Sequence, residues 1–127
     1  MAVYVVNLVI DQGADFTQTF NLENDASASA LDLTGYTGAA QLRKHSSSNK
    51  KFDFSVAFPD REGGIVRIDM TDTITSSIKP GRYVYDLLLT ASGGTRTRIV
   101  EGSALVREGA TRIKSWELKY ELVNKLV

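Results

Sequence analysis

The chain has 127 residues, and 43% of them are hydrophobic, which is enough for one domain with its own core. Fifteen basic and fifteen acidic residues cancel to a net charge of zero, whereas nucleic-acid binders usually carry a basic excess that neutralises phosphates. We therefore expect no nucleic-acid partner. Because the chain has no cysteine, disulfides, thiolate metal sites and cysteine nucleophiles are excluded.

The first ten or so residues form a nearly continuous apolar run that is rich in β-branched side chains and favours a strand. Alternation gives this run two apolar faces, one of Val3, Val5 and Val9 and the other of Tyr4, Val6, Leu8 and Ile10. A strand that is apolar on both faces is normally covered on both. The run is therefore a candidate subunit interface, with Tyr4 and Val6 as contact residues. A central strand of a well-covered sandwich is an equally open interpretation.

The same run is not expected to direct export or to span a membrane. It lacks a positively charged start and a small-residue cleavage site, as a signal peptide would need. It is also much shorter than the roughly 20 apolar residues of a membrane-spanning helix. We therefore expect synthesis in a cytoplasm and no membrane partner.

Four further stretches alternate between apolar and polar side chains and are predicted to be strands: 16–22, 37–44, 52–58 and 65–70. In the second of these, Gly38 and Ala40 imply close packing against a neighbouring backbone or a large side chain. Polar loops are expected at 23–30 and 45–51. The segment 71–78 is too short and polar for a full helix, but Asp72 and the threonines could cap one helical turn.

The clearest element is a hairpin over residues 80–107. Its first strand places Tyr83, Tyr85, Leu87 and Leu89 on one face. A Ser-Gly-Gly turn at 92–94 sends the chain back, and Gly102 suggests a bulge or bend in the returning strand. Asp86 lies on the opposite face of the first strand, where we expect it to form a structural ion pair with Arg82, Arg96 or Arg98.

Seven to eight short strands with regular turn signals and no long helical period predict an all-β, antiparallel β-sandwich, with a closed barrel as the alternative. We expect this domain to cover residues 1–112, followed by an apolar extension at 113–127. The extension alternates like a strand but also fits a helical spacing. It should dock on its own domain or, in our preferred reading, on a neighbour. The expected contact residues in it are Trp116, Leu118, Tyr120 and Leu122.

No set of side chains has the spacing of a catalytic, metal or cofactor site. His45 is the only histidine and lies in a serine-rich loop without a readable partner carboxylate or nucleophile. The acidic clusters do not match a calcium loop and are better explained by turns and caps. Arg43, Lys44, Lys50 and Lys51 flank the serine loop and are more readily explained as a solvated face than as an anion or sugar patch. We predict that the chain is not an enzyme.

Several segments in a fixed order carry a family resemblance: 12–16, 31–36, 40–44, 64–68, 78–87 and 101–111. The Leu-Thr-Gly-Tyr of 33–36 and the Pro-Gly-Arg-Tyr-Val-Tyr-Asp of 80–86 are its most specific parts. In this order the segments resemble a small immunoglobulin-like domain of tailed-phage virion proteins, similar to the N-terminal domain of phage baseplate upper proteins. The resemblance covers residues 5–112. It matches turns and core positions, so it implies no catalytic residues.

The resemblance implies a virion structural protein, made in the host cytoplasm, that attaches other proteins to a tail or baseplate. Its expected partners are other virion proteins and copies of itself, without a small-molecule substrate or a cofactor. No receptor-binding domain follows residue 112, which favours an adaptor over direct host recognition. A capsid decoration protein is an alternative of the same class. A carbohydrate-binding module for host surface glycan, with an aromatic platform beside the basic loops, is the alternative of another class.

Overall fold

The structure is a computed structural model that describes residues 3–24 and 29–111. These residues form an all-β fold, as predicted. Its elements are β1 (Tyr4–Val5), β2 (Leu8–Asp11), β3 (Phe16–Asn21), β4 (Thr37–Arg43), β5 (Phe52–Asp60), β6 (Ile65–Met70), α1 (Asp72–Ser76), β7 (Gly81–Thr90) and β8 (Arg96–Arg107). Within those two ranges no helix is long and apolar enough to cross a membrane. The predicted extension at 113–127 lies outside the described residues.

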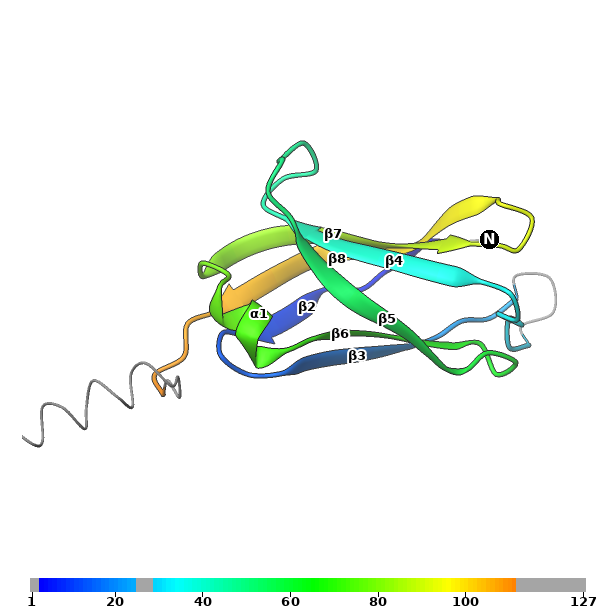
Figure 1. The fold of residues 1–127 in the computed structure, drawn as a ribbon, viewed down its shortest axis with the longest axis horizontal. Helices are drawn as coiled ribbons and strands as arrows, with labels where there is room; N and C mark the ends of the chain where they lie inside the picture. The colour runs from blue at the N-terminus through cyan, green and yellow to red at the C-terminus, as the bar shows by residue number, and fades with distance from the viewer. Residues whose placement is uncertain (1–2, 25–28, 112–127) are drawn as a thin grey trace, which may run out of the picture.

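The strands form one curled sheet in the order β1-β8-β7-β4-β5-β6-β3, and β2 also pairs with β8. Strand β5 links the two layers of the curl. Its residues 52–54 pair with β4, and its later residues, up to position 60, pair with β6. Figure 1 shows β5 crossing diagonally from the layer of β4, β7 and β8 to the layer of β3 and β6.

The prediction of a wholly antiparallel arrangement is wrong at the N-terminal end. Strands β1 and β2 run parallel to β8, and the other strand pairs are antiparallel. Tyr4 pairs with Val100 and Leu8 with Ala104. Parallel neighbours need a long connection between them. Here the connection from β2 to β8 contains nearly the whole domain. Local alternation carries no information about such a distant partner.

The core fills the space between the two layers, and the predicted inward faces supply it. The inward residues of β7 are Tyr83, Tyr85, Leu87 and Leu89, and they are all buried. Phe54 of β5 packs edge-on to Tyr85, with the ring centroids 6.1 Å apart. Aromatic pairs of this geometry stabilise a core beyond the area that they bury. The buried aliphatic residues from the other strands include Leu8, Ile10, Leu42, Val66, Ile68, Ile99, Val100 and Val106.

The predicted irregularity of the returning strand lies at a different residue from the one expected. The register of β7 and β8 shifts between the pairs Leu87–Val100 and Leu88–Arg98, so Ile99 is the extra residue. Ile99 and Val100 are consecutive and both fully buried, as an extra residue in one strand allows. Gly102 instead pairs in register with Tyr85. It lies against the backbone of Val6 in the N-terminal segment.

The predicted helical turn is confirmed as α1, with Thr71 as its N-cap. The side chain of Thr71 accepts a hydrogen bond from the backbone of Ile74, which satisfies one of the free donors at the helix start. Thr75 is fully buried, and its hydroxyl donates to the carbonyl of Ala14 (2.9 Å) while accepting from the N–H of Gly13 (3.1 Å). These two bonds fix the β2–β3 turn against the helix.

Candidate functional site

The N-terminal strand is interrupted at Val6 and Asn7, between β1 and β2, and side-chain contacts attach this break to the sheet. The hydroxyl of Tyr85 donates to the carbonyl of Val6 (2.5 Å). Asn7 Oδ1 accepts from both the backbone N–H and the hydroxyl of Ser103, each at 3.1 Å. A Cβ atom on Gly102 would lie 2.2 Å from the carbonyl oxygen of Val6. Only glycine at this position therefore lets the backbone of Val6 lie this close to β8.

The alternation of the strand decides which of its faces is available to another molecule. Tyr4 and Val6, the predicted contact residues, are half-buried and pack against the domain's own core. The hydroxyl of Tyr4 also accepts a long hydrogen bond (3.4 Å) from the backbone N–H of Glu23 in the other layer. The exposed face consists of Val3, Val5 and Val9, with exposed fractions of 44%, 72% and 51%.

The alternation in the sequence separated these two faces correctly, but it did not say which of them faces outward. Side-chain size is the signal that could have found the exposed valines. The inward face carries the larger residues Tyr4, Leu8 and Ile10, and a core buries the larger apolar set first. The other predicted contact residues, Trp116, Leu118, Tyr120 and Leu122, lie outside the described residues, so their role stays a prediction.

One of the exposed valines, Val5, lines an open groove of about 740 Å³ on the outer face of the sheet. Its apolar lining comes from Val5, Val84 and Leu88, and Val84 is 40% exposed. One row of register partners crosses five adjacent strands of this face, namely Val5, Glu101, Asp86, Gln41 and Asp53. Sequence reasoning singled out neither Val84 nor Leu88 as a contact residue. Their outward placement follows from the alternation of β7.

Arg98 bridges two of the acids in this row. Asp86 and Glu101 are direct register partners, and like charges placed opposite each other destabilise a sheet. The guanidinium of Arg98 lies 3.3 Å from Asp86 Oδ2 and 3.7 Å from Glu101 Oε2. The expected ion pair of Asp86 is therefore confirmed, with Arg98 as its partner. With its acids held in this way, the groove offers apolar surface and fixed polar groups to a partner.

Two carboxyl groups near this face have lowered pKa values. At the β4–β5 side, the hydrogen bond from Lys51 holds the pKa of Asp53 below its usual range. At the end of β2, the hydrogen bond from Arg107 does the same for Asp11, and the charge of Arg107 adds to the effect. In contrast, burial raises the pKa of the Tyr85 phenol to about 12. Each of these shifts has a structural cause, and none creates a proton donor or acceptor suited to neutral pH.

Within residues 3–24 and 29–111, no group of three or more His, Asp or Glu side chains is placed to hold a metal ion. His45 is exposed in the loop between β4 and β5. Its backbone N–H donates to the Ser48 hydroxyl (3.1 Å), and its carbonyl accepts from the Ser48 N–H (3.0 Å). These bonds make a local turn at the start of the loop.

No protein-family model matches this chain, and no curated protein matches it. Among solved structures it is similar to an internalin-like protein of Listeria monocytogenes, at 14% identity and a TM-score of 0.43, over 84% of this chain and 28% of that one. It is also similar to a family 123 glycoside hydrolase of Clostridium perfringens, at 13% identity and a TM-score of 0.40, over 86% of this chain and 24% of that one. The chain thus spans less than a third of either protein, and likeness at this level says nothing about activity.

Proposed function

We propose that this chain is a non-enzymatic attachment subunit that is held in a larger assembly through its N-terminal edge. The observation that carries the proposal is the exposure of Val3, Val5 and Val9 along the N-terminal edge, where Val5 also lines the groove with Val84 and Leu88. Contiguous exposed apolar surface of this kind is typical of protein contacts. The occupant is another protein subunit, in the simplest case a second copy of the chain.

The edge position adds a second mode of contact. In the described residues β1 pairs with β8 on one side only, so the other side of its backbone has no strand neighbour. A strand from another subunit can add to such an edge through main-chain hydrogen bonds. Val5, at 72% exposure, would then pack against apolar side chains of the added strand.

We propose that the curled mixed sheet is, more specifically, an immunoglobulin-like sandwich. The support is a tyrosine at the start of β7 whose hydroxyl bonds back to the preceding corner, as Tyr83 does to the Lys79 carbonyl at 2.6 Å. This tyrosine corner is a feature of immunoglobulin-like sandwiches at the equivalent turn between layers. The passage of β5 between the two layers agrees with such an arrangement.

The resemblance to domains of tailed-phage virion proteins makes a tail or baseplate adaptor the specific form of this proposal. A capsid decoration protein is the alternative within the same class. Mass spectrometry of purified particles separates the two, because a decoration protein covers the whole shell and a tail adaptor is present in far fewer copies. Absence of the chain from particles of a phage that encodes it would overturn the virion assignment.

The contact face itself is tested with a matched pair of substitutions. Val5→Lys places a charge on the exposed N-terminal edge, and Thr19→Lys places the same charge on the exposed face of β3 at the other edge. Sedimentation velocity of the full chain over a range of concentrations should show association for the wild type and for Thr19→Lys. We expect Val5→Lys to associate at least tenfold more weakly, about 1.4 kcal/mol, because the lysine must be desolvated in the contact.

Both variants should unfold within about 0.5 kcal/mol of the wild type, since neither residue is in the core. If Val5→Lys and the wild type associate equally, this face is not the contact. If all three proteins stay monomeric at every concentration, the second copy is not the occupant, and incorporation of the same variants into particles then tests a different subunit.

The carbohydrate-binding alternative stays a prediction, and the outer groove does not favour it. Aromatic platforms bind sugars through exposed ring faces, and the aromatic side chain that lines this groove is Tyr85, which is only 4% exposed. Its ring faces the core and is packed there by Phe54.

A further inference from the structure

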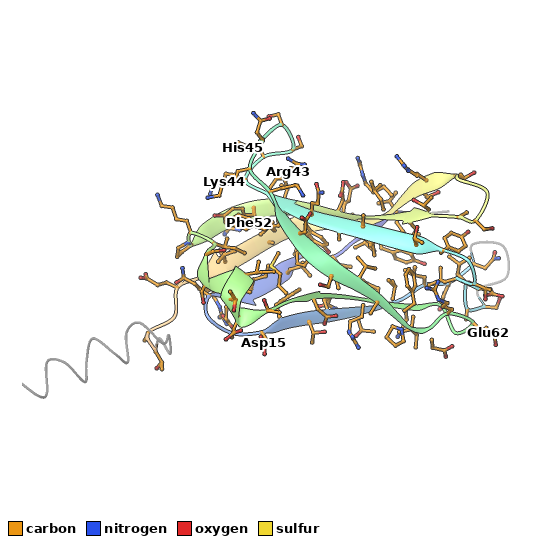
Figure 2. All side chains as sticks on the ribbon, in the orientation of Figure 1. Asp15, Arg43, Lys44, His45, Phe52 and Glu62 are labelled. Carbon is orange, nitrogen blue, oxygen red and sulfur yellow. The ribbon has the colours of Figure 1, made fainter. Side chains whose placement is uncertain are left out.

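A second cavity of about 370 Å³ lies at the end of the sandwich where α1 is found, and its lining is basic and aromatic. It is formed where the β4–β5 loop approaches the segment that leads into β7. Figure 2 shows Lys44, His45 and Phe52 at this loop, which projects from the body of the fold. The lining residues are Lys44, Ser48, Lys50, Phe52, Lys79, Pro80 and Tyr83.

The ammonium of Lys44 is positioned by two neighbours. It lies over the ring of Tyr83, 4.9 Å from the centroid, where the negative face of the ring attracts a cation. A Cβ atom on Gly81 would lie 3.0 Å from Lys44 Nζ, so the glycine leaves room for this ammonium. The Tyr83 hydroxyl in turn donates to the carbonyl of Lys79 (2.6 Å), which fixes the backbone of the second lysine.

The third lysine and the loop are also held in place. Lys50 Nζ lies over the ring of Phe52, 5.4 Å from its centroid, and that ring packs edge-on to Tyr83 with centroids 6.5 Å apart. The carbonyl of Ser48 accepts a hydrogen bond from Arg43 Nη1 (2.5 Å). The cavity is therefore built on contacts between its own walls, and it does not depend on a chance arrangement of surface side chains.

The charges in this cavity are not neutralised by the domain. Among the described residues, Lys44, Lys50 and Lys79 form no ion pair with a carboxylate, and the lining contains no acidic side chain. The adjacent Lys51 differs, because it pairs with Asp53 at 2.8 Å. Like charges brought together repel, so an anion that enters the cavity lowers the electrostatic energy of all three lysines.

We propose that this cavity binds an acidic sugar, a pyranose ring that bears a carboxylate. The volume lies at the small end of the range for ligand sites and suits one or two rings. The half-buried Phe52 and the exposed Pro80 supply apolar walls for the ring, and the lysines supply cations that need no bidentate geometry. A nucleic acid would need a basic surface extended over many phosphates, and the chain has a net charge of zero.

This binding activity goes beyond the proposed attachment function and does not depend on it. Its residues belong to the β4–β5 loop and the start of β7, whereas the attachment face is formed by β1 and the outer face of the sheet. Val5→Lys should therefore leave sugar binding unchanged. The two proposals can fail separately.

The test is isothermal titration calorimetry of the full chain with two pairs of probes, trigalacturonate against galactotriose and sialyllactose against lactose. At least one acidic probe should bind, its neutral counterpart should not, and binding should weaken with added salt. Lys44→Gln, Lys50→Gln and Lys79→Gln should each weaken binding about two- to fivefold, as expected for exposed ion pairs. The matched control is Lys51→Gln, which should leave the affinity unchanged because Lys51 already pairs with Asp53.

Inorganic phosphate is the third arm of the test. If phosphate binds as tightly as the acidic sugars, the apolar walls contribute nothing and the sugar assignment is wrong. If Lys51→Gln weakens binding as much as Lys50→Gln, the charge is diffuse and the cavity is not the site. Failure of both acidic sugars to bind would overturn the proposal, and circular dichroism of each variant confirms that it is folded.

Discussion

The two edges of this sheet differ in what they present to solvent. At one edge, β1 and β2 expose Val3, Val5 and Val9. At the other edge, the outward residues of β3 are Thr17, Thr19 and Asn21, which are polar and exposed. Natural proteins protect edge strands from unwanted pairing with polar or charged residues. The β3 edge follows this rule and the N-terminal edge does not, and the proposed attachment face rests on this difference.

The edges also differ in how they are fastened. Strand β3 pairs with β6 over six consecutive residues, from Phe16 with Met70 to Asn21 with Ile65. The N-terminal strand is broken into a two-residue piece and a four-residue piece. At the break, the chain is held against β8 by the hydroxyl of Tyr85, the side chain of Asn7 and the close approach at Gly102. A short strand contributes few ladder bonds, so these side-chain contacts decide whether the apolar edge is presented in one fixed position.

The largest effect is expected from Gly102→Ala. The added Cβ would lie 2.2 Å from the Val6 carbonyl oxygen and 2.8 Å from its carbon, so the backbone at Val6 must move away from β8. We expect a loss of about 2–3 kcal/mol in the free energy of unfolding, measured with urea, as for an overpacked site. Hydrogen exchange should show the loss first at β1.

Gly93→Ala is the matched control, because no atom lies within 4 Å of its added Cβ. It should change the stability by less than about 0.5 kcal/mol. Equal unfolding free energies for Gly102→Ala and Gly93→Ala would show that the close approach at Val6 does not restrict the edge.

A smaller effect is expected from Tyr85→Phe, which removes the hydrogen bond to Val6 and keeps the ring. The loss should be about 0.5–1.5 kcal/mol, typical of one hydrogen bond. Protection of the Val6 amide, which donates to the Glu101 carbonyl at 3.0 Å, should fall with it. Tyr83→Phe is the control, since its hydroxyl bonds to Lys79 and should leave that amide protected.

The same variant should change the response to alkaline pH. Burial raises the pKa of Tyr85 to about 12, above the value of about 10 expected in the unfolded chain. The folded state therefore favours the neutral phenol. Its contribution to stability is complete below about pH 10 and is lost as the pH rises from 10 to 12. Tyr85→Phe should flatten the stability profile in this window, and an unchanged profile would assign the alkaline transition to another group.

The hairpin and the other antiparallel strands were predictable because their information is local. Alternation over β7 placed Tyr83, Tyr85, Leu87 and Leu89 in the core, and residues 71–78 carried the signal of a capped turn. The parallel pairing of β1 and β2 with β8 was not predictable, because it depends on partners about a hundred positions away. The role of Gly102 was missed for the same reason, since the chain that passes over it is the distant Val6.

The contact residues named from the sequence stay a prediction. The sequence separated the two faces of the first strand, but Tyr4 and Val6 turned out to pack on the core while the valines face outward. The sequence placed Lys44 and Lys50 at the two ends of one loop and favoured a solvated face for them, but it could not show that the fold brings Lys79 and Tyr83 beside them. Local sequence also could not show that Lys51 is paired and its neighbour Lys50 is not.

The smallest effect is expected from Arg107→Gln at the far end of the N-terminal edge. Arg107 Nη2 lies 2.8 Å from Asp11 Oδ1, and its hydrogen bond is the main cause of the lowered pKa of Asp11. A lowered folded pKa contributes stability above the unfolded value, and this contribution is lost as the pH falls through the folded value. Both side chains are more than half exposed, so solvent screens the pair and urea unfolding at neutral pH should barely change.

The measurable result is instead an upward shift of the Asp11 carboxyl titration, followed by carbon-13 NMR, toward the pKa of a free aspartate. Arg67→Gln is the counterpart beside the β3 edge, because Arg67 pairs with Asp69 at 2.9 Å. It should leave the titration of Asp11 unchanged. If Asp11 titrates identically in the wild type and in Arg107→Gln, the last residue of β2 is held only by its pairing with β8. The side-chain contacts that hold the N-terminal edge are then those at Val6 and Asn7.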